Sequence, residues 1–147
     1  MLVKGKQYRT IWPNKALSEV TIIDQTYLPF EFKLRPLRSL KEVVEAIKKM
    51  RVRGAPLIGV TAAYGIAIAL IKNSSDKYLT EAKKLLIQSR PTAVNLAWAV
   101  NFVFNKLKKE PIGTRISLAW RLANDLADQD VKDNLLIGEH GLKLIEK

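Results

Sequence analysis

Two arginine-containing turns hold the residue types in this sequence that are best suited to binding an anion. The first is Arg53-Gly54-Ala55-Pro56, and the second is Arg90-Pro91. Each lies just ahead of a segment that we expect to be helical, and a helix N-terminus presents free N–H groups and a partial positive charge. Gly54 lets the backbone turn tightly with no Cβ in the way of a ligand, and Pro56 fits a first helical turn. Two guanidinium groups and two helix ends could together bind one phosphate or carboxylate.

A plainer interpretation of these turns stays open at this point. An arginine ahead of a helix is often only solvated, and Arg53 and Arg90 would then be ordinary loop residues. Other chemistry is more restricted, because the chain contains no Cys and only one His, His140. Disulfides and thiolate chemistry are therefore excluded within the chain, and we expect neither a metal site nor a Cys-His catalytic pair.

The net charge of +11 raises the question of an acidic partner. The lysines occur in short groups at the ends or outer faces of predicted helices, where a solvated surface is the usual explanation. These groups are Lys48-Lys49, Lys83-Lys84, and Lys106 with Lys108-Lys109. No aromatic residues are interleaved with them, and no groove-reading motif is present. We therefore do not expect nucleic acid as a partner.

The most apolar segment runs from Pro56 to Ile71 and is interrupted by Gly59, Thr61 and Tyr64. Spanning a bilayer takes about 20 mainly apolar residues, so we expect this segment to be the central helix of a protein core and expect no membrane partner. The N-terminus shows no signal-peptide pattern, and a cytoplasmic location follows as the default expectation.

The sequence predicts a single domain over residues 1–147 that is mainly α with a small N-terminal antiparallel β-meander, an α+β fold. Residues 1–36 form the predicted meander, with β-prone segments at 8–12, 19–24 and 30–34. Residues 37–147 form a predicted helical bundle. Its helices are expected at 39–50, 56–71, 76–89, 92–109, 114–129 and 131–146.

Local signals add detail to these helices. Ser39 and Glu42 have the spacing of a capping box, and Asp76 or Thr80 can cap the third helix. Gly138 and Gly141 weaken the last helix and indicate close packing or a break. The candidate core positions of the fourth helix are Val94, Ala97, Trp98, Asn101, Phe102 and Leu107.

Beyond these physical patterns, two stretches of the chain resemble a known family. Residues 53–65 and residues 89–96, the latter reading Ser-Arg-Pro-Thr-Ala-Val-Asn-Leu, look like S-methyl-5-thioribose-1-phosphate isomerase. Three further segments have the order and approximate spacing of that family's N-terminal half: Ile11-Trp12, Ile23-Asp24-Gln25 with Leu28-Pro29, and residues 137–141. The wider superfamily includes ribose-1,5-bisphosphate isomerases and regulatory subunits of the eukaryotic initiation-factor exchange complex.

The resemblance implies an aldose–ketose isomerase of methionine salvage, which converts 5-methylthioribose 1-phosphate to 5-methylthioribulose 1-phosphate without a metal or nucleotide cofactor. Residue-by-residue matching assigns contacts with the phosphorylated sugar to Arg53, Gly54, Ala55 and Arg90. The family's catalytic Cys and Asp lie in a C-terminal Rossmann-like domain that would begin just beyond Lys147. The chain therefore resembles an N-terminal fragment with no catalytic residue, and we expect it to be inactive by itself.

The implied partners are the phosphorylated sugar and the missing C-terminal domain, in cis or in trans. Family members dimerise mainly through the absent half, so the resemblance leaves a homodimer of this chain open. The alternative function is a non-catalytic regulatory or assembly module that binds protein or nucleic acid. In either case we expect an exposed apolar surface where the second domain would dock.

Overall fold

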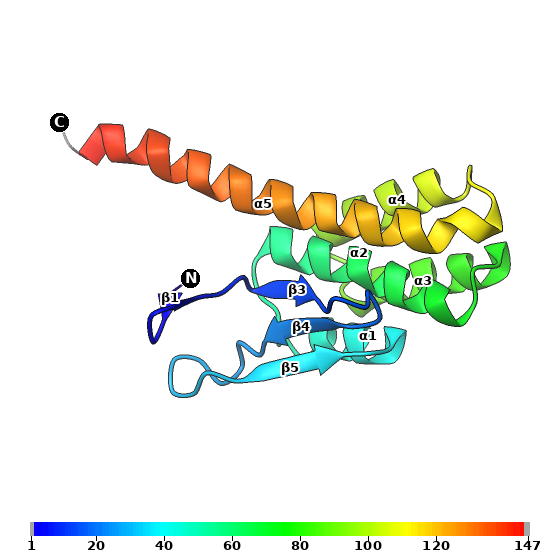
Figure 1. The fold of residues 1–147 in the computed structure, drawn as a ribbon, viewed down its shortest axis with the longest axis horizontal. Coiled ribbons are helices and arrows are strands. Elements are labelled where there is room, and N and C mark those ends of the chain that lie inside the picture. Colours follow the sequence, from blue (N-terminus) through cyan, green and yellow to red (C-terminus); the bar gives the residue numbers. More distant parts are fainter. Residues whose placement is uncertain (1, 146–147) are drawn as a thin grey trace.

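The computed structural model describes residues 2–145 and shows the expected mainly α fold with a small β part (Figure 1). Within these residues the strands are β1 (Leu2–Val3), β2 (Lys6–Gln7), β3 (Ile11–Pro13), β4 (Val20–Ile23) and β5 (Leu34–Leu37). The α-helices are α1 (Leu40–Lys48), α2 (Ala55–Lys72), α3 (Asp76–Ser89), α4 (Val94–Leu107) and α5 (Arg115–Ile145), with a short 3-10 turn, η1 (Ile112–Thr114), ahead of α5.

The predicted meander is present as an antiparallel sheet in the order β3-β4-β5. Its third strand lies at Leu34–Leu37 and not at 30–34 as predicted, because Leu37 is buried at this register while Phe30 is 93% exposed. Residues 30–33 have the composition of a strand but no core to face. The short β1–β2 hairpin ahead of the sheet was not predicted.

Helix α2 is the central element, and α1, α3, α4 and α5 all pack against it. Every residue from Leu57 to Leu70 is buried, so this helix has no polar face. By length and composition α2 would suffice to cross a membrane, but 78% of it is buried inside the protein, as in a core helix. Sheet residues such as Val20 and Leu37 belong to the same hydrophobic core, which confirms that the strands pack on the helices.

The predicted caps are partly correct. Ser39 and Glu42 form a complete capping box at α1, as predicted. The N-cap of α3 is Ser75, whose hydroxyl accepts from the Tyr78 N–H, so the prediction of Asp76 or Thr80 was wrong. Asp76 lies one residue later, in the first turn, where the partial positive charge of the helix N-terminus interacts favourably with its carboxylate.

Helix α5 is continuous where the sequence predicted two helices. Across the expected break, Gln129 donates a hydrogen bond to Asp133 and Asn134 donates one to Asp130, and such i,i+4 pairs stabilise a helix. Gly138 and Gly141 lie inside the helix, and neither marks close packing, because a Cβ at either position would meet nothing within 4 Å. Residue 146, the predicted end of the last helix, lies outside the described residues.

The inward face of α4 also differs from the prediction. Val94 is 78% exposed and Trp98 is 58% exposed, although both were candidate core positions. The buried positions are Leu96, Ala99, Val100, Val103, Phe104 and Leu107. Both faces are apolar, so periodicity could not decide which one would meet α2.

Replacing Gly138 by alanine is expected to stabilise the protein by up to about 1 kcal/mol, because alanine is the better helix former and the added methyl group meets open space. Thermal unfolding followed by circular dichroism measures the effect. A lower melting temperature in the variant would contradict a continuous α5.

Candidate functional site

The N-termini of α2 and α4 open on one surface cavity of about 370 Å³. Of the four predicted site residues, Gly54, Ala55 and Arg90 line it, together with Met50 and Asn95. Segments that are far apart in the sequence thus meet at one place, as the two-turn hypothesis requires.

Arg53 is the predicted site residue that does not line this cavity. Its side chain is exposed, and its Nε donates a hydrogen bond to the Met50 carbonyl at 3.3 Å. Arg90 is half-buried, and its Nη1 contacts the Met50 Sδ at 3.0 Å. Both arginines therefore contact the same residue, Met50, which has a left-handed backbone conformation with φ of 55°. Within residues 2–145, neither guanidinium forms a salt bridge with a carboxylate, so both charges are available to an anion.

The N-termini of α2 and α4 at the cavity differ from those of α1 and α3. In the described part of the chain, the N-caps of α2 and α4 are Gly54 and Ala93, and neither helix has a side-chain cap. In contrast, serine side chains cap α1 and α3. Gly54 has φ of 94°, a conformation that favours glycine. Backbone N–H groups without a side-chain partner are therefore available on two sides of one cavity, which suits an anion.

The detailed form of the second turn differs from the prediction. We expected the helix after Arg90 to begin at about residue 92, directly after Pro91, but α4 begins at Val94, after a turn in which the Ala93 N–H donates to the Arg90 carbonyl at 3.0 Å. This turn places Arg90 beside the end of α1. Met50 and Asn95 were not assigned to the site from the sequence, although Asn95 belongs to the Arg-Pro-Thr-Ala-Val-Asn block.

A buried carboxylate, that of Asp24, lies close to Arg51, which leads into the first turn. Asp24 is 1% exposed and accepts hydrogen bonds from the Thr26 hydroxyl at 2.6 Å and from the Arg35 Nε at 2.9 Å. The Arg51 Nε lies 3.6 Å from the same carboxylate. Burial acts to raise the pKa of Asp24, but the hydrogen bonds from Thr26 and Arg35 outweigh it, so the pKa lies below its ordinary value of 3.8.

This lowered pKa predicts a loss of stability in acid. Because the folded protein binds the Asp24 proton more weakly than the unfolded chain, the contribution of Asp24 is complete above its unfolded pKa and is lost as the pH falls through the folded one. We expect wild-type protein to lose more unfolding free energy than Asp24→Asn between about pH 5 and pH 2. Urea unfolding at several pH values measures how the unfolding free energy of each protein changes with pH. The same change in wild type and in Asp24→Asn would contradict the prediction.

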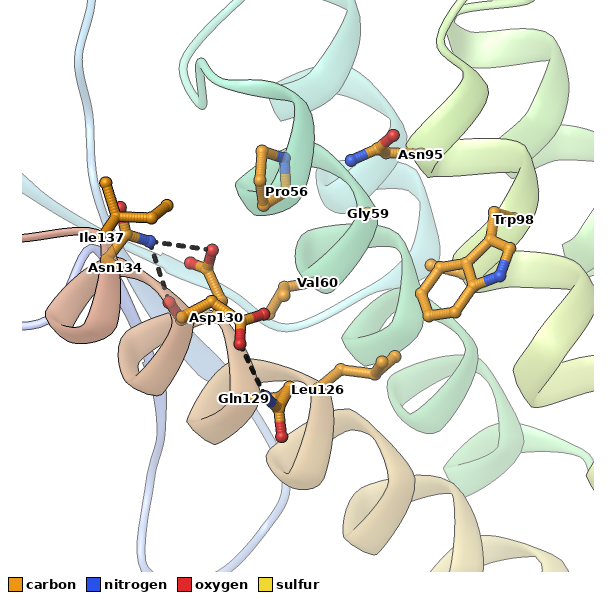
Figure 2. Close-up of a pocket in the computed structure, with 12 residues that line it drawn as sticks. Pro56, Gly59, Val60, Asn95, Trp98, Leu126, Gln129, Asp130, Asn134 and Ile137 are labelled. Carbon is orange, nitrogen blue, oxygen red and sulfur yellow. Dashed lines mark hydrogen bonds between the residues drawn. The ribbon is translucent and has the colours of Figure 1, made fainter. Parts of the chain in front are cut away.

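A second cavity of about 390 Å³ adjoins the first, and Asn95 lines both. Figure 2 shows it between α2, α4 and α5, with Pro56 and Val60 on one wall, Trp98 on another and Ile137 on α5. The helices α2 and α4 approach each other closely here. A Cβ added to Gly59 would lie only 2.9 Å from the Asn95 backbone oxygen. We call this cavity the apolar groove.

Besides Leu126 and Ile137, polar residues line the α5 side of the apolar groove. Asn134 donates hydrogen bonds to the backbone carbonyl and the carboxylate of Asp130, and Gln129 donates to Asp133 (Figure 2). Burial and the neighbouring Asp133 raise the pKa of Asp130. Beyond the groove, the last part of α5 projects from the bundle, and its apolar residues Leu144 and Ile145 are 77% and 82% exposed (Figure 1). Apolar side chains are therefore exposed on this part of α5, and docking of a second domain there stays a prediction.

Comparison with known proteins places this geometry in a family context. Residues 51–147 match the Initiation factor 2 subunit family. A methylthioribose-1-phosphate isomerase from Rhodospirillum rubrum is 48% identical over 99% of this chain and 37% of its own length. The crystal structure of 5-methylthioribose 1-phosphate isomerase from Pyrococcus horikoshii is 35% identical with a TM-score of 0.85, over 94% of this chain and 41% of that one.

A structure of translation initiation factor eIF-2B subunit delta from A. fulgidus is equally similar in fold. It is 36% identical with a TM-score of 0.84, over 94% of this chain and 42% of that one. The chain thus spans about two fifths of these three relatives. Because the family match covers most of the sequence and includes both arginine turns, the chain belongs to the Initiation factor 2 subunit family.

Proposed function

We propose that this chain contributes part of the sugar-phosphate site of an aldose–ketose isomerase that converts 5-methylthioribose 1-phosphate to 5-methylthioribulose 1-phosphate in methionine salvage. The observation that carries the proposal is the meeting of two helix N-termini, neither capped by a side chain within the described residues, with Arg90 at one cavity and with Arg53 beside it. The names of the Rhodospirillum rubrum and Pyrococcus horikoshii relatives support the choice of substrate.

In this proposal the chain binds and orients the substrate. The helix ends and the guanidinium groups neutralise the phosphate, and this binding energy fixes the sugar carbons that exchange hydrogen during the reaction. The groups that move the hydrogen are supplied by a second domain, in cis or in trans. The chain alone is then inactive, and no metal or cofactor takes part.

Isothermal titration of the chain with 5-methylthioribose 1-phosphate tests the proposal. Unphosphorylated 5-methylthioribose is the matched control, because it has the same sugar and methylthio group but no anion. We expect binding of the phosphorylated sugar at least about tenfold tighter than that of the control, since charge-assisted hydrogen bonds are worth about 1.5–3 kcal/mol. Equal affinities, or no binding of either compound, would contradict it.

The apolar groove favours a second candidate function, that of a non-catalytic module docking a partner protein or domain. Trp98 and Ile137 both line the groove and are 58% and 69% exposed. Large apolar side chains exposed together mark an interaction site, whereas a single exposed one needs no explanation. The eIF-2B subunit among the similar structures supports such a role. The test is to mix the chain with the separately expressed remainder of the Rhodospirillum rubrum isomerase. Isomerase activity on mixing supports the first function, whereas a stable complex without activity supports the second.

A further inference from the structure

We infer that Asp24 is a positioning residue for the anion-binding turn and that it acts through Arg51. The inference rests on the proposed function. It concerns the Ile23-Asp24-Gln25 segment, which lies at the end of β4 and lines neither of the two cavities described above.

Three kinds of contact fix Arg51, two residues ahead of Arg53. Its backbone N–H donates to the Ala46 carbonyl at 2.9 Å, and its carbonyl accepts from the Gln25 N–H at 2.9 Å. Its side chain lies between the carboxylates of Asp24 and Glu45, with Nε 3.6 Å from the first and Nη2 3.1 Å from the second. The sheet and α1 therefore both determine where the chain enters the turn.

The residues that follow have fewer restraints of their own. Val52 is buried, but Arg53 and Gly54 are exposed, and the Arg53 side chain donates a hydrogen bond to the Met50 carbonyl within the same turn. A Cβ on Gly54 would meet nothing within 4 Å, so packing does not restrain that position. The placement of Gly54 relative to Arg90 consequently depends on the anchor at Arg51 as well as on α2.

Burial makes the interaction between Asp24 and Arg51 costly to break. The Asp24 side chain is 1% exposed and the Arg51 side chain 17% exposed, and a buried ion is costly to leave without its partner. When the Asp24 charge is removed, Arg35 and Arg51 both lose their shared carboxylate. Arg51 still has Glu45, whose side chain is 39% exposed, and we expect the guanidinium to move toward it.

The chain offers a matched control because Arg35 shares the same carboxylate. Arg35 lies in β5, and its Nε is 2.9 Å from Asp24, closer than that of Arg51. Loss of Arg35, whose side chain is 38% exposed against 17% for Arg51, removes an ion pair with the same carboxylate without touching the residues that lead into Gly54. A merely structural role for the cluster predicts similar effects of Arg35→Gln and Arg51→Gln, whereas positioning predicts different ones.

The experiment measures the affinity of inorganic phosphate by calorimetry and the amide hydrogen exchange of Gly54 by NMR, in wild type and in Asp24→Asn, Arg51→Gln, Arg51→Lys and Arg35→Gln. We expect Asp24→Asn, Arg51→Gln and Arg51→Lys to weaken phosphate binding by about tenfold and to accelerate exchange at Gly54, since small misplacements of a binding group are costly. Arg51→Lys retains the positive charge, so its loss of affinity separates position from charge. Arg35→Gln is expected to bind phosphate within about twofold of wild type.

Equal losses of affinity in Arg35→Gln and Arg51→Gln would overturn the inference, as would wild-type affinity in Arg51→Lys. If Asp24→Asn fails to fold, the contrast between Arg51→Lys and Arg35→Gln decides the question. If wild type binds no phosphate, the proposed function fails at this site. In that case the amide exchange of Gly54 alone tests the positioning role. Faster exchange in Arg51→Lys supports this role, and unchanged exchange overturns it.

Discussion

Replacement of Arg90 by alanine is expected to weaken binding of 5-methylthioribose 1-phosphate by about 10- to 100-fold, because a charge-assisted hydrogen bond contributes about 1.5–3 kcal/mol. Arg90 lines the cavity between the two helix ends and has the Met50 sulfur as its hydrogen-bond acceptor. A thioether is a weak acceptor, so little is lost when the guanidinium turns to a phosphate. Calorimetric titration of the purified variant measures the change.

Two further variants make this result specific. Arg38→Ala removes one exposed positive charge that pairs with Glu19, so it controls for the change in net charge. Arg90→Lys retains the charge but loses the planar fork, and we expect an affinity between those of wild type and Arg90→Ala. If Arg38→Ala weakened binding as much as Arg90→Ala, the effect would come from the overall field of the protein and Arg90 would have no direct role.

The part of the site that could be predicted from the sequence depends on the backbone preferences of residues that are neighbours in the chain. Gly54 and Pro56 indicate a tight turn followed by a helix start whatever surrounds them, and the structure places that turn at the N-terminus of α2. That the turns at Arg53 and Arg90 could bind one anion was a hypothesis from their similar settings, and the bundle brings Gly54 and Arg90 to one cavity. Arg53, which meets the same criteria, does not line this cavity, and its side chain donates to the Met50 carbonyl.

The parts that could not be predicted depend on contacts between distant segments. The sequence placed Trp98 in the core because α4 is apolar on two faces, and only the structure shows that the face with Ala99 and Val103 is the buried one. The pairing of Asp24 with Arg51 joins a strand end to a turn, and no spacing rule connects these positions. The sequence predicted an end near residue 129, whereas the hydrogen bonds of Gln129 with Asp133 and of Asn134 with Asp130 lie across this point in one continuous α5.

Replacement of Gly59 by alanine is expected to destabilise the protein and to disturb both cavities. The new Cβ would lie 2.9 Å from the Asn95 backbone oxygen and 3.3 Å from the Ala99 Cβ. A backbone carbonyl inside a helix cannot rotate away, so α2 and α4 must separate. Overpacking of this kind costs about 1–3 kcal/mol, of which the better helix propensity of alanine returns up to about 1 kcal/mol.

The same substitution elsewhere in the chain provides the control for Gly59→Ala. Gly138→Ala makes the identical chemical change in a helix where the methyl group meets open space, and its expected effect on stability has the opposite sign. Guanidinium unfolding of both variants measures the contrast. Because Asn95 lines both cavities, separation of α2 from α4 also moves one of the two helix ends, and we expect Gly59→Ala to lose phosphate affinity while Gly138→Ala retains it. A destabilised Gly59→Ala with wild-type affinity would show that the two helix ends do not act on the same anion.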